Sequence, residues 1–367
     1  MKILFLISSL SAGGAERVVS NLSNYWASTN NHELTIMTIA NNKDFYFLNP
    51  AIKRIVLNAD IDSKTFISGL FNNILRIVKI RKNLKLIKPE IVIGMTYSCA
   101  IPLIIASIGL KCKIIVSERT FPPIQNIGSI WNILRWILYP FASKVVVLTT
   151  ENKNWFNKNI PRANIEIIPN PAIFPLNNEN GDIKRINEYI SKSDNIILSV
   201  GRMDEGKQFN KLIFTFFKLL PTLKNWKLVI VGSGPRYSSL VGLVSRLKLT
   251  EHVVFPGQCN NIGDWYARAS IYVMSSKYEG FPNSLVEALA YGCPSISYDC
   301  DTGPRDIINN YQNGILVSPV GDIPALTFAV KTLIEDFELR EKFSQNAINI
   351  RKNLSIEFVA KLWEKLF

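Results

Sequence analysis

The chain has 367 residues, 47% of them hydrophobic and 19% charged, a balance that fits a folded protein of two domains and excludes a disordered one. Its five cysteines form no C-x-x-C pair and only two histidines accompany them, which argues against a disulfide framework and a His/Cys zinc site and favours a reducing, cytoplasmic setting. The net charge of +13 is concentrated in residues 1–150, where 17 Lys and Arg face 7 Asp and Glu, and suits an anionic partner or simply aids solubility.

Short β-branched runs alternate with helical patterns along the chain, which is typical of parallel sheets whose strands are buried on both faces. The expected strands are residues 2–8, 33–39, 90–95, 113–118, 144–149, 164–169, 195–201, 227–232, 252–257, 271–276 and 294–299. The first reads as a buried strand rather than a secretory signal. The longest apolar run, residues 100–110, is too short to span a bilayer.

The chain also looks doubled, because KILFLISSLSAGGAER and NIILSVGRMDEGKQ both run from a strand through a polar, glycine-containing loop into a helix. We therefore expect an α/β protein of two doubly wound Rossmann-like domains that face a central cleft. The polar stretch 175–194 is the expected hinge, with domains at 1–178 and 179–350. The amphipathic segment 351–367 is expected to pack back toward the first domain.

The loop SAGGAER, residues 11–17, joins the first strand to the first helix. Gly13 and Gly14 would let a phosphate or a sugar approach the backbone closely. The loop lacks a full G-x-G-x-x-G and a P-loop lysine, so it supports neither nicotinamide nor ATP binding.

Two segments of the first half combine helical apolar spacing with basic or aromatic residues. Residues 71–88 carry six Lys and Arg, and residues 129–144 carry aromatic side chains around Arg135. Such segments lie in membrane interfaces, where anionic lipid attracts each cation by about 1 kcal/mol. Ordinary helices packed on a sheet would show the same pattern, and this alternative stays open.

The loop GRMDEGKQ follows the strand at 195–201 and therefore lies at a carboxyl end, where ligands of such sheets bind. Arg202 and Lys207 could clamp a pyrophosphate through charge-assisted hydrogen bonds. The alternative is a solvated loop. A second glycine loop, VGSGPR at 231–236, gives weaker support for phosphate binding.

The stretch YEGFPNSLVEALAYGCP places Glu279 before a turn and Glu287 inside the helix that follows. The start of that helix is an anion site, because its free backbone amides carry a partial positive charge. Ser284 and Glu287 also have the spacing of a capping box, which is the structural alternative for Glu287. Glu279 has no such explanation. The two carboxylates are suited to contact two different parts of one long ligand, whose anionic group would bind at the helix start between them.

Six stretches in this order resemble the retaining GT-B glycosyltransferases of the family 4 type: SAGGAERVV, SVGRMDEGK, VGSGP, VVFPGQ, the E-x7-E run EGFPNSLVE and TGPRDII. The resemblance spans most of the chain. Within the family, the chain resembles bacterial enzymes that extend undecaprenyl-diphosphate-linked glycans, including an α-1,4-N-acetylgalactosaminyltransferase.

The resemblance implies roles for particular residues. Glu287 would hold the ribose of a UDP-sugar, Glu279 would contact the donor sugar, and Arg202 and Lys207 would neutralise the leaving diphosphate. The other implied donor-binding residues are Gly13, Gly14, Gly232, Pro256, Phe281, Pro282, Asn283 and Ser284. Where many members carry a histidine near the sugar, this chain has VSERT, so Glu118 would take over a contact with acceptor or donor sugar.

The implied activity is transfer of a hexose or N-acetylhexosamine, with retention, from a UDP-sugar to a glycan linked to undecaprenyl diphosphate, in surface polysaccharide or O-antigen biosynthesis. No cofactor, metal or nucleic acid is expected. The protein would sit at the inner face of the cytoplasmic membrane, attached through 71–88 and 129–144.

Two rival functions remain. A metal-dependent GT-A transferase would use a DxD pair, at Asp60 and Asp62 or at Asp299 and Asp301. A non-catalytic partner subunit would have kept the transferase fold without its activity.

Overall fold

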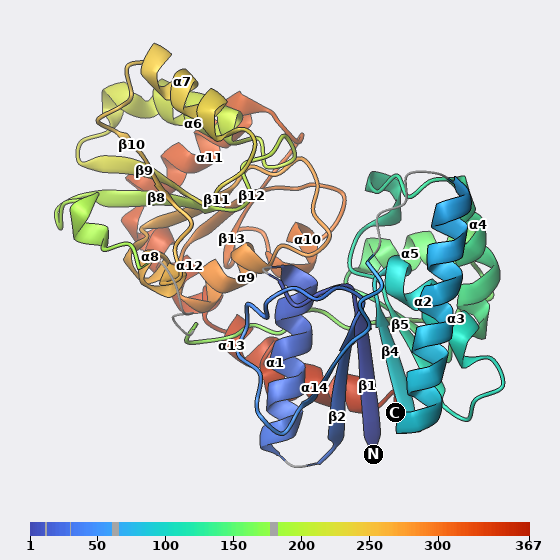
Figure 1. Ribbon diagram of the computed structural model, residues 1–367. Coiled ribbons are helices and arrows are strands. Elements are labelled where there is room, and N and C mark those ends of the chain that lie inside the picture. The colour runs from blue at the N-terminus through green and yellow to red at the C-terminus, as the bar shows by residue number, and fades with distance from the viewer. Residues whose placement is uncertain (12, 30, 61–65, 177–182) are drawn as a thin grey trace. The chain divides into compact units, whose positions relative to one another are not determined.

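The computed structural model describes residues 1–11, 13–29, 31–60, 66–176 and 183–367 (Figure 1). The chain forms two compact units. Unit 1 is Met1–Pro171 with Ile356–Phe367, and unit 2 is Ala172–Ser355. The expected division lay at 178/179, and the terminal segment was expected to begin at residue 351. Part of the expected hinge, residues 177–182, lies outside the described residues.

Unit 1 is built on a seven-stranded parallel sheet in the order β3-β2-β1-β4-β5-β6-β7. Its strands are β1 (Lys2–Ile7), β2 (Glu33–Thr38), β3 (Lys53–Val56), β4 (Ile91–Met95), β5 (Lys113–Ser117), β6 (Lys144–Val147) and β7 (Ile165–Ile167). Its helices are α1 (Gly14–Ser28), α2 (Phe66–Ile87), α3 (Tyr97–Ser107), α4 (Ser129–Leu138), α5 (Thr150–Asn159) and α14 (Ile356–Glu364), with short 3-10 turns at Pro122–Ile124 and Tyr139–Phe141.

Unit 2 is built on a six-stranded parallel sheet in the order β10-β9-β8-β11-β12-β13. Its strands are β8 (Asn195–Val200), β9 (Trp226–Val231), β10 (Val253–Gly257), β11 (Ile271–Met274), β12 (Ser295–Tyr298) and β13 (Gly314–Val317). Its α-helices are α6 (Phe209–Leu219), α7 (Tyr237–Arg246), α8 (Ile262–Arg268), α9 (Asn283–Ala290), α10 (Pro304–Ile307), α11 (Ile323–Glu335), α12 (Phe337–Ala347) and α13 (Ile350–Asn353). Two 3-10 turns lie at Ile186–Glu188 and Leu220–Thr222.

The prediction of two doubly wound parallel sheets is confirmed, and each of the expected strands forms within two residues of its expected bounds. The sequence analysis missed β3 and β13, which are edge strands of four residues each. Central strands such as β4 and β11 are buried along their whole length, because helices cover both faces of each sheet.

Helix α14 packs on α1 in unit 1, although the two lie at opposite ends of the sequence. Val359 and Trp363 join the hydrophobic cluster around Phe5 and Trp26. Trp26 Nε1 also donates a hydrogen bond to Glu364 Oε1 at 2.9 Å. The apolar face of this helix, which the sequence analysis expected to need a partner, is therefore buried within unit 1.

Each sheet reverses its strand order at one point, and that point places the ligand site. In unit 1 the reversal lies between β1 and β4, and in unit 2 it lies between β8 and β11. The connections that leave two such neighbouring strands diverge to opposite faces of the sheet and open a crevice at the carboxyl ends. The loops after β1, β8 and β11 carry most of the candidate site residues.

The described helices include none that combines the length and the apolar character needed to cross a bilayer.

Candidate active site

In unit 2 the loops after β8 and β11 are joined by an ion pair between two predicted site residues. Lys207 Nζ lies 2.6 Å from Glu279 Oε1, and the two side chains are 21% and 11% exposed. The residues are 72 positions apart in sequence and meet because β8 and β11 are neighbours at the strand-order reversal. Arg202 lies in the same loop as Lys207 and is exposed to solvent. The cations and the carboxylate therefore share one edge of the sheet.

Backbone contacts hold the two loops in this arrangement. The hydroxyl of Ser275 donates to the carbonyl of Lys207 at 2.8 Å, and the amide of Lys277 donates to the carbonyl of Gly206 at 2.7 Å. Lys207 therefore approaches Glu279 from a loop that is fixed to the β11 loop on both sides. This support lets the ammonium and the carboxylate meet without ordering a long flexible segment.

The glycine loop after β9 packs directly on the loop that carries Arg202. A Cβ on Gly232 would lie 2.0 Å from the carbonyl oxygen of Gly201, and its φ of 140° is unfavourable for other residues. The Gly232 amide donates to the carbonyl of Gly257, next to the buried Pro256. The positions implied for donor binding after β8, β9 and β10 thus form one continuous backbone surface.

The turn before α9 is tightly bonded. The amides of Asn283 and Leu285 donate to the carbonyls of Phe281 and Pro282, both at 3.0 Å. Phe281 and Pro282 are buried, and Asn283 and Ser284 are half-buried. The helix therefore begins next to Glu279, with its amino end at the same sheet edge as Lys207.

The capping-box alternative for Glu287 is wrong. Helix α9 starts from Pro282, and no side chain caps it. Ser284 Oγ accepts a hydrogen bond from the Tyr272 hydroxyl at 2.9 Å, and Glu287 Oε2 accepts one from the Tyr266 hydroxyl at 3.0 Å. Glu287 is 8% exposed, so Tyr266 fixes its carboxylate in a largely buried position. The sequence analysis did not foresee Tyr266, which lies 21 positions earlier.

The motif TGPRDII supports the β11 loop from the other side. The hydroxyl of Thr302 donates to the carbonyl of Glu279. Gly303 has a φ of 98°, and a Cβ there would lie 2.6 Å from Pro282. Thr302 is thus a further site residue that sequence reasoning missed, although the motif that contains it belonged to the resemblance.

The candidate DxD pairs do not gather further metal ligands. Asp299 pairs with Arg305 at 2.9 Å, and Asp301 is exposed. Asp62 lies outside the described residues. In the described part of the chain, no three His, Cys, Asp or Glu side chains group as a metal ion would require.

Unit 1 has its own polar cluster at the carboxyl ends of β1 and β5. Gly13 precedes α1, Gly14 begins it, and the Tyr46 hydroxyl donates to the Gly13 carbonyl at 3.1 Å. Burial raises the pKa of Glu16 in the first turn of α1. Burial lowers the pKa of Arg119 to about 10, and Glu16 opposes that shift, so the guanidinium stays cationic at neutral pH. Glu16 was not among the predicted site residues.

Glu118 lies in a buried ion pair. Its carboxylate is 1% exposed and lies 3.1 Å from Arg135 Nε, and the Tyr139 hydroxyl donates to it. Burial raises the pKa of Glu118, and Arg135 opposes this effect. The carboxylate is enclosed by its partners within unit 1. The expected contact of Glu118 with a sugar stays a prediction, and in the structure Arg135 and Tyr139 are its partners.

The two basic or aromatic segments differ in how they use their charges. In α2, Lys79 donates to the carbonyls of Leu57 and Asn58, and Arg81 donates to those of Ala106 and Ile108. These cations tie the helix to neighbouring loops. In α4, Arg135 is buried. Much of the expected positive surface thus has a structural use, whereas the exposed cations of α2 are Lys82 and Lys85.

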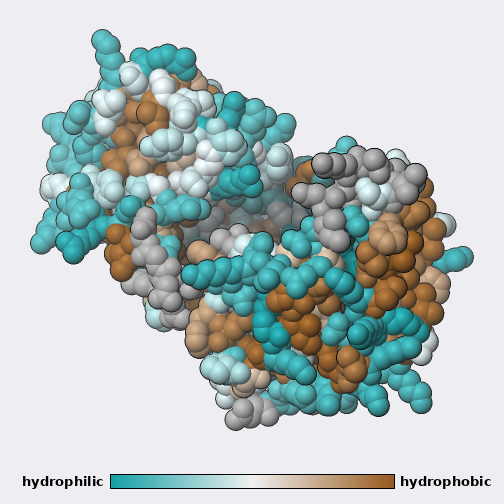
Figure 2. All heavy atoms as spheres, in the orientation of Figure 1, coloured by the Kyte–Doolittle hydropathy of each residue, from teal (hydrophilic) through white to brown (hydrophobic). Residues whose placement is uncertain are grey.

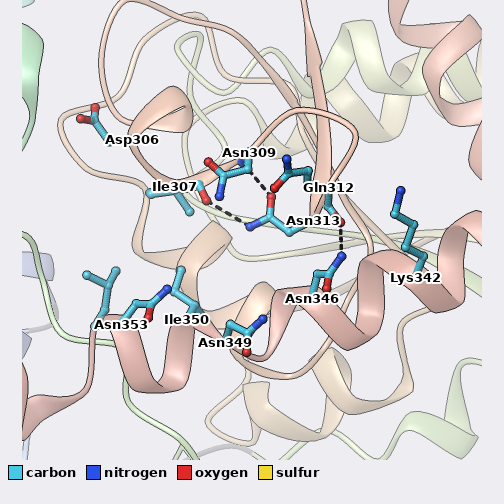
Figure 3. A pocket seen from close by; sticks show the side chains of 11 residues that line it. Asp306, Ile307, Asn309, Gln312, Asn313, Lys342, Asn346, Asn349, Ile350 and Asn353 are labelled. Atoms are coloured by element: carbon cyan, nitrogen blue, oxygen red, sulfur yellow. Dashed lines mark hydrogen bonds between the residues drawn. The ribbon is translucent and has the colours of Figure 1, made fainter.

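A separate pocket of about 530 Å³ in unit 2 lies between the loop after α10 and the helices α12 and α13 (Figure 3). Its lining side chains are mostly amides, and two of them are already bonded: Asn313 Nδ2 donates to the Ile307 carbonyl, and Asn346 Nδ2 donates to the Gln312 carbonyl. Its one carboxylate and one ammonium, Asp306 and Lys342, leave it close to neutral. This pocket does not suit a diphosphate and includes none of the predicted site residues.

Two family profiles together cover nearly the whole chain. Residues 12–172 match Glycosyltransferase Family 4, and residues 182–350 match Glycosyl transferases group 1. The two matches correspond to the two sheets described above. Each candidate site residue of the β8 and β11 loops falls within the second match.

Curated relatives align over the full length. An N-acetylgalactosamine-N,N′-diacetylbacillosaminyl-diphospho-undecaprenol 4-alpha-N-acetylgalactosaminyltransferase of Campylobacter jejuni is 30% identical over 94% of this chain and 93% of its own length. A second α-1,4-N-acetyl-D-galactosaminyltransferase of that species is 29% identical over 100% and 98%. An amylovoran biosynthesis glycosyltransferase of Erwinia amylovora is 27% identical over 100% and 99%.

Solved structures share the whole fold. Sucrose-phosphate synthase from Thermosynechococcus elongatus superimposes with a TM-score of 0.83 at 18% identity, covering 100% of this chain and 98% of that one. TarM of S. aureus gives 0.77 at 13% identity, covering 100% and 98%. The fold therefore excludes the alternative of a metal-dependent GT-A transferase with a DxD pair. The chain belongs to the GT-B glycosyltransferases of the family 4 type.

Proposed function

We propose that the protein transfers a hexose or N-acetylhexosamine from a UDP-sugar to a lipid-linked glycan, with retention of the anomeric configuration and without a metal ion. The observation that carries this proposal is the ion pair of Lys207 with Glu279 next to the amino end of α9, with Arg202 in the same loop as Lys207. The names of the two Campylobacter relatives, which act on glycans linked to undecaprenyl diphosphate, support the acceptor class.

The donor diphosphate would lie between the loop after β8 and the start of α9. Lys207 and Arg202 offer charge-assisted hydrogen bonds to phosphate oxygens, and the helix start adds backbone amides. Relatives of this fold have been solved with UDP, among them the HepE protein of Anabaena with UDP and glucose. At the far end of the nucleotide, Glu287 would accept hydrogen bonds from the ribose hydroxyls, held in place by Tyr266.

The mechanism follows from where the charge develops. As the bond between the anomeric carbon and the diphosphate breaks, negative charge grows on the leaving oxygen, which Lys207 and Arg202 are placed to stabilise. Glu279, bonded to Lys207, would also accept a hydrogen bond from a sugar hydroxyl and so orient the ring. The acceptor hydroxyl would attack on the face that the diphosphate leaves, and a phosphate oxygen would take its proton.

A lipid-linked acceptor would bring the enzyme to a membrane surface. Helix α4 turns Ile130, Ile133, Trp136 and Ile137 toward solvent, each between 46% and 59% exposed. Figure 2 shows hydrophobic surface over this part of unit 1. We propose peripheral attachment to the inner face of the cytoplasmic membrane through α2 and α4, with Lys82 and Lys85 meeting anionic lipid. The exposed apolar residues of these helices would suit a protein partner as well as a lipid. A liposome-binding assay distinguishes the two.

The second candidate is a non-catalytic subunit that kept this fold. The intact pair of Lys207 and Glu279, held by hydrogen bonds between the two loops, favours an enzyme, because it keeps a cation and a carboxylate together at the carboxyl ends of β8 and β11. The alternative predicts that a Lys207→Ala/Glu279→Ala protein still supports normal glycan in cells.

A donor panel tests the proposal. Radiolabelled UDP-sugars and GDP-sugars are incubated with membranes of the source organism, with and without EDTA, and transfer to lipid is counted. We expect transfer from one UDP-sugar, unaffected by EDTA, an α-linked product, and no transfer by the double variant. Transfer that requires a metal ion, that uses only a GDP-sugar, or that persists in the double variant would contradict the proposal.

A further inference from the structure

Helices α2, α3 and α4 of unit 1 enclose an apolar groove that the donor site does not explain. The groove has a volume of about 510 Å³, and its walls include Ile74 and Ile77 of α2, Ile101 and Ile105 of α3, and Trp131 of α4. Asn73 and Ser129 are the only polar side chains among its lining residues. A groove with this lining suits a hydrocarbon chain rather than a sugar, a nucleotide or an ion.

The groove opens onto a surface that is itself apolar. Along α2, Leu70, Phe71 and Ile74 are each between 49% and 60% exposed. Helix α4 reverses the usual pattern of an amphipathic helix, in which apolar residues are buried and charged residues are exposed. Its Arg135 is 1% exposed, whereas its isoleucines face solvent. Contiguous apolar surface of this extent marks an interaction site.

Charge next to the groove indicates the kind of molecule that enters it. Helices α2 and α4 contain no carboxylate. Arg76 Nη1 lies 3.3 Å from the side-chain oxygen of Asn73, which lines the groove, and Nη2 donates to the Ala59 carbonyl at 3.1 Å. Arg76 is half-buried and contacts the lining residue Asn73, so a cation lies next to the groove. This arrangement fits an apolar chain that ends in an anion.

We propose that this groove seats the isoprenoid chain of the lipid-linked acceptor, with Arg76 facing its diphosphate. The inference rests on the proposed function for the identity of the acceptor. A bilayer alone would be met by the convex face of α4, whereas a recess between three helices holds one chain. Seating the chain there would hold the acceptor on unit 1 and fix how far its sugars extend from the protein.

A photoreactive chain tests the proposal on the full-length protein. Farnesyl diphosphate carrying a benzophenone is irradiated with the protein, and the labelled peptides are identified by mass spectrometry. We expect label within 69–77, 101–105 or 127–134, and loss of label when undecaprenyl diphosphate is added in excess. Label at other segments, or label that phosphatidylglycerol displaces as well as undecaprenyl diphosphate does, overturns the proposal.

Matched variants sharpen the test. Ile74→Glu places a carboxylate in the groove and should reduce labelling at least about tenfold, since an unpaired charge is costly in an apolar site. Val78→Glu adds the same charge one turn along α2 at a position outside the groove lining, with similar exposure, and should leave labelling unchanged. Ser129→Trp fills the groove without adding charge and should also block labelling. Equal labelling of the Ile74 and Val78 variants contradicts the proposal.

Two further measurements separate the groove from the donor site and the head group from the chain. UDP affinity, measured by calorimetry, should be the same in all three variants, so that a failure of UDP binding in the wild type counts against the proposed function alone. Arg76→Gln should weaken labelling by the diphosphate probe and leave labelling by the matching farnesol probe intact. Equal losses with both probes contradict the role given to Arg76.

Discussion

Lys207 Nζ lies 2.6 Å from Glu279 Oε1, and this ion pair joins the loops that follow two neighbouring strands of unit 2. Both side chains are partly exposed, so solvent screens the pair and its worth to stability is small. In the proposed function the pair matters because of where its two groups lie. The Lys207 ammonium would contact the diphosphate, and the Glu279 carboxylate would contact a sugar hydroxyl. The predictions below separate these two roles.

Glu279→Gln should lower kcat/KM for sugar transfer by about a hundredfold, because the amide cannot orient the sugar hydroxyl and hold Lys207 at once. UDP affinity should stay the same or rise, since Lys207 loses its carboxylate partner and becomes free for phosphate. Steady-state kinetics and UDP calorimetry check both parts. Glu205→Gln is the matched control, because Glu205 lies in the loop with Lys207, is 80% exposed and pairs with Arg236 rather than with Lys207. A large loss of UDP affinity in Glu279→Gln would contradict this assignment.

Glu287→Ala should abolish discrimination between UDP and 2′-deoxy-UDP. The wild type should prefer UDP by about tenfold, as expected when a buried acceptor loses the hydroxyl that it bonds. Tyr266→Phe should reduce UDP affinity less than Glu287→Ala does, because it removes only the 3.0 Å hydrogen bond that positions the carboxylate. Competition titrations measure these affinities. A Glu287→Ala protein that still prefers UDP would show that another group reads the ribose.

The buried pair of Glu118 and Arg135 should behave as a structural unit. Glu118→Ala or Arg135→Ala alone should lower the free energy of unfolding by about 3–5 kcal/mol, because each leaves an uncompensated buried charge. The double change Glu118→Leu/Arg135→Met should recover most of that loss. Urea denaturation of the three proteins measures the coupling. Additive losses would mean that the pair does not act as one element, and loss of transfer without loss of stability in Glu118→Gln would support its predicted role at the sugar.

His32 should make the docking of α14 sensitive to acid. Its side chain is 8% exposed and lies 3.7 Å from Glu364, and burial lowers the pKa of His32 while Glu364 opposes that shift. A histidine whose folded pKa is lowered binds its proton more readily when unfolded. Its contribution to stability is therefore complete above the unfolded value of about 6.5 and is lost as the pH falls from there through the folded pKa.

The free energy of unfolding should thus fall more between pH 7 and pH 5 in the wild type than in His32→Gln, measured by urea titration at each pH. A steeper fall of the free energy of unfolding in His32→Gln would mean that the pKa of His32 is raised by folding. Glu364, rather than burial, would then set the direction of the shift.

The fold could be predicted from the sequence because its strands are continuous apolar runs, whereas the missed strands are short and lie at sheet edges. In β3, KRIV begins with two cations, and none of its residues is fully buried, so it lacks the signal that marks central strands. These two edge strands form because β3 pairs with β2 and β13 pairs with β12, and such pairing cannot be recognised from the local sequence.

The site was recovered in part. Motifs located Lys207 and Glu279 separately, and the order of the strands brings them together. The partners of Ser284 and Glu287 could not be foreseen, because Tyr272 and Tyr266 lie 12 and 21 positions earlier on other elements. Ser284 and Glu287 have the spacing of a capping box, but their side chains accept hydrogen bonds from the two tyrosine hydroxyls instead of capping the helix. The partners of Glu118 could not be foreseen for the same reason, since Arg135 and Tyr139 are distant in sequence and close in the fold.

The most direct test of the central claim compares UDP with uridine in calorimetric titrations of wild type and Lys207→Ala. If the loop after β8 and the start of α9 bind a diphosphate, the wild type should bind UDP at least about a hundredfold more tightly than uridine, and Lys207→Ala should weaken UDP at least about tenfold while leaving uridine unchanged. Equal affinity of the wild type for UDP and uridine, or an unchanged UDP affinity in Lys207→Ala, would contradict the account.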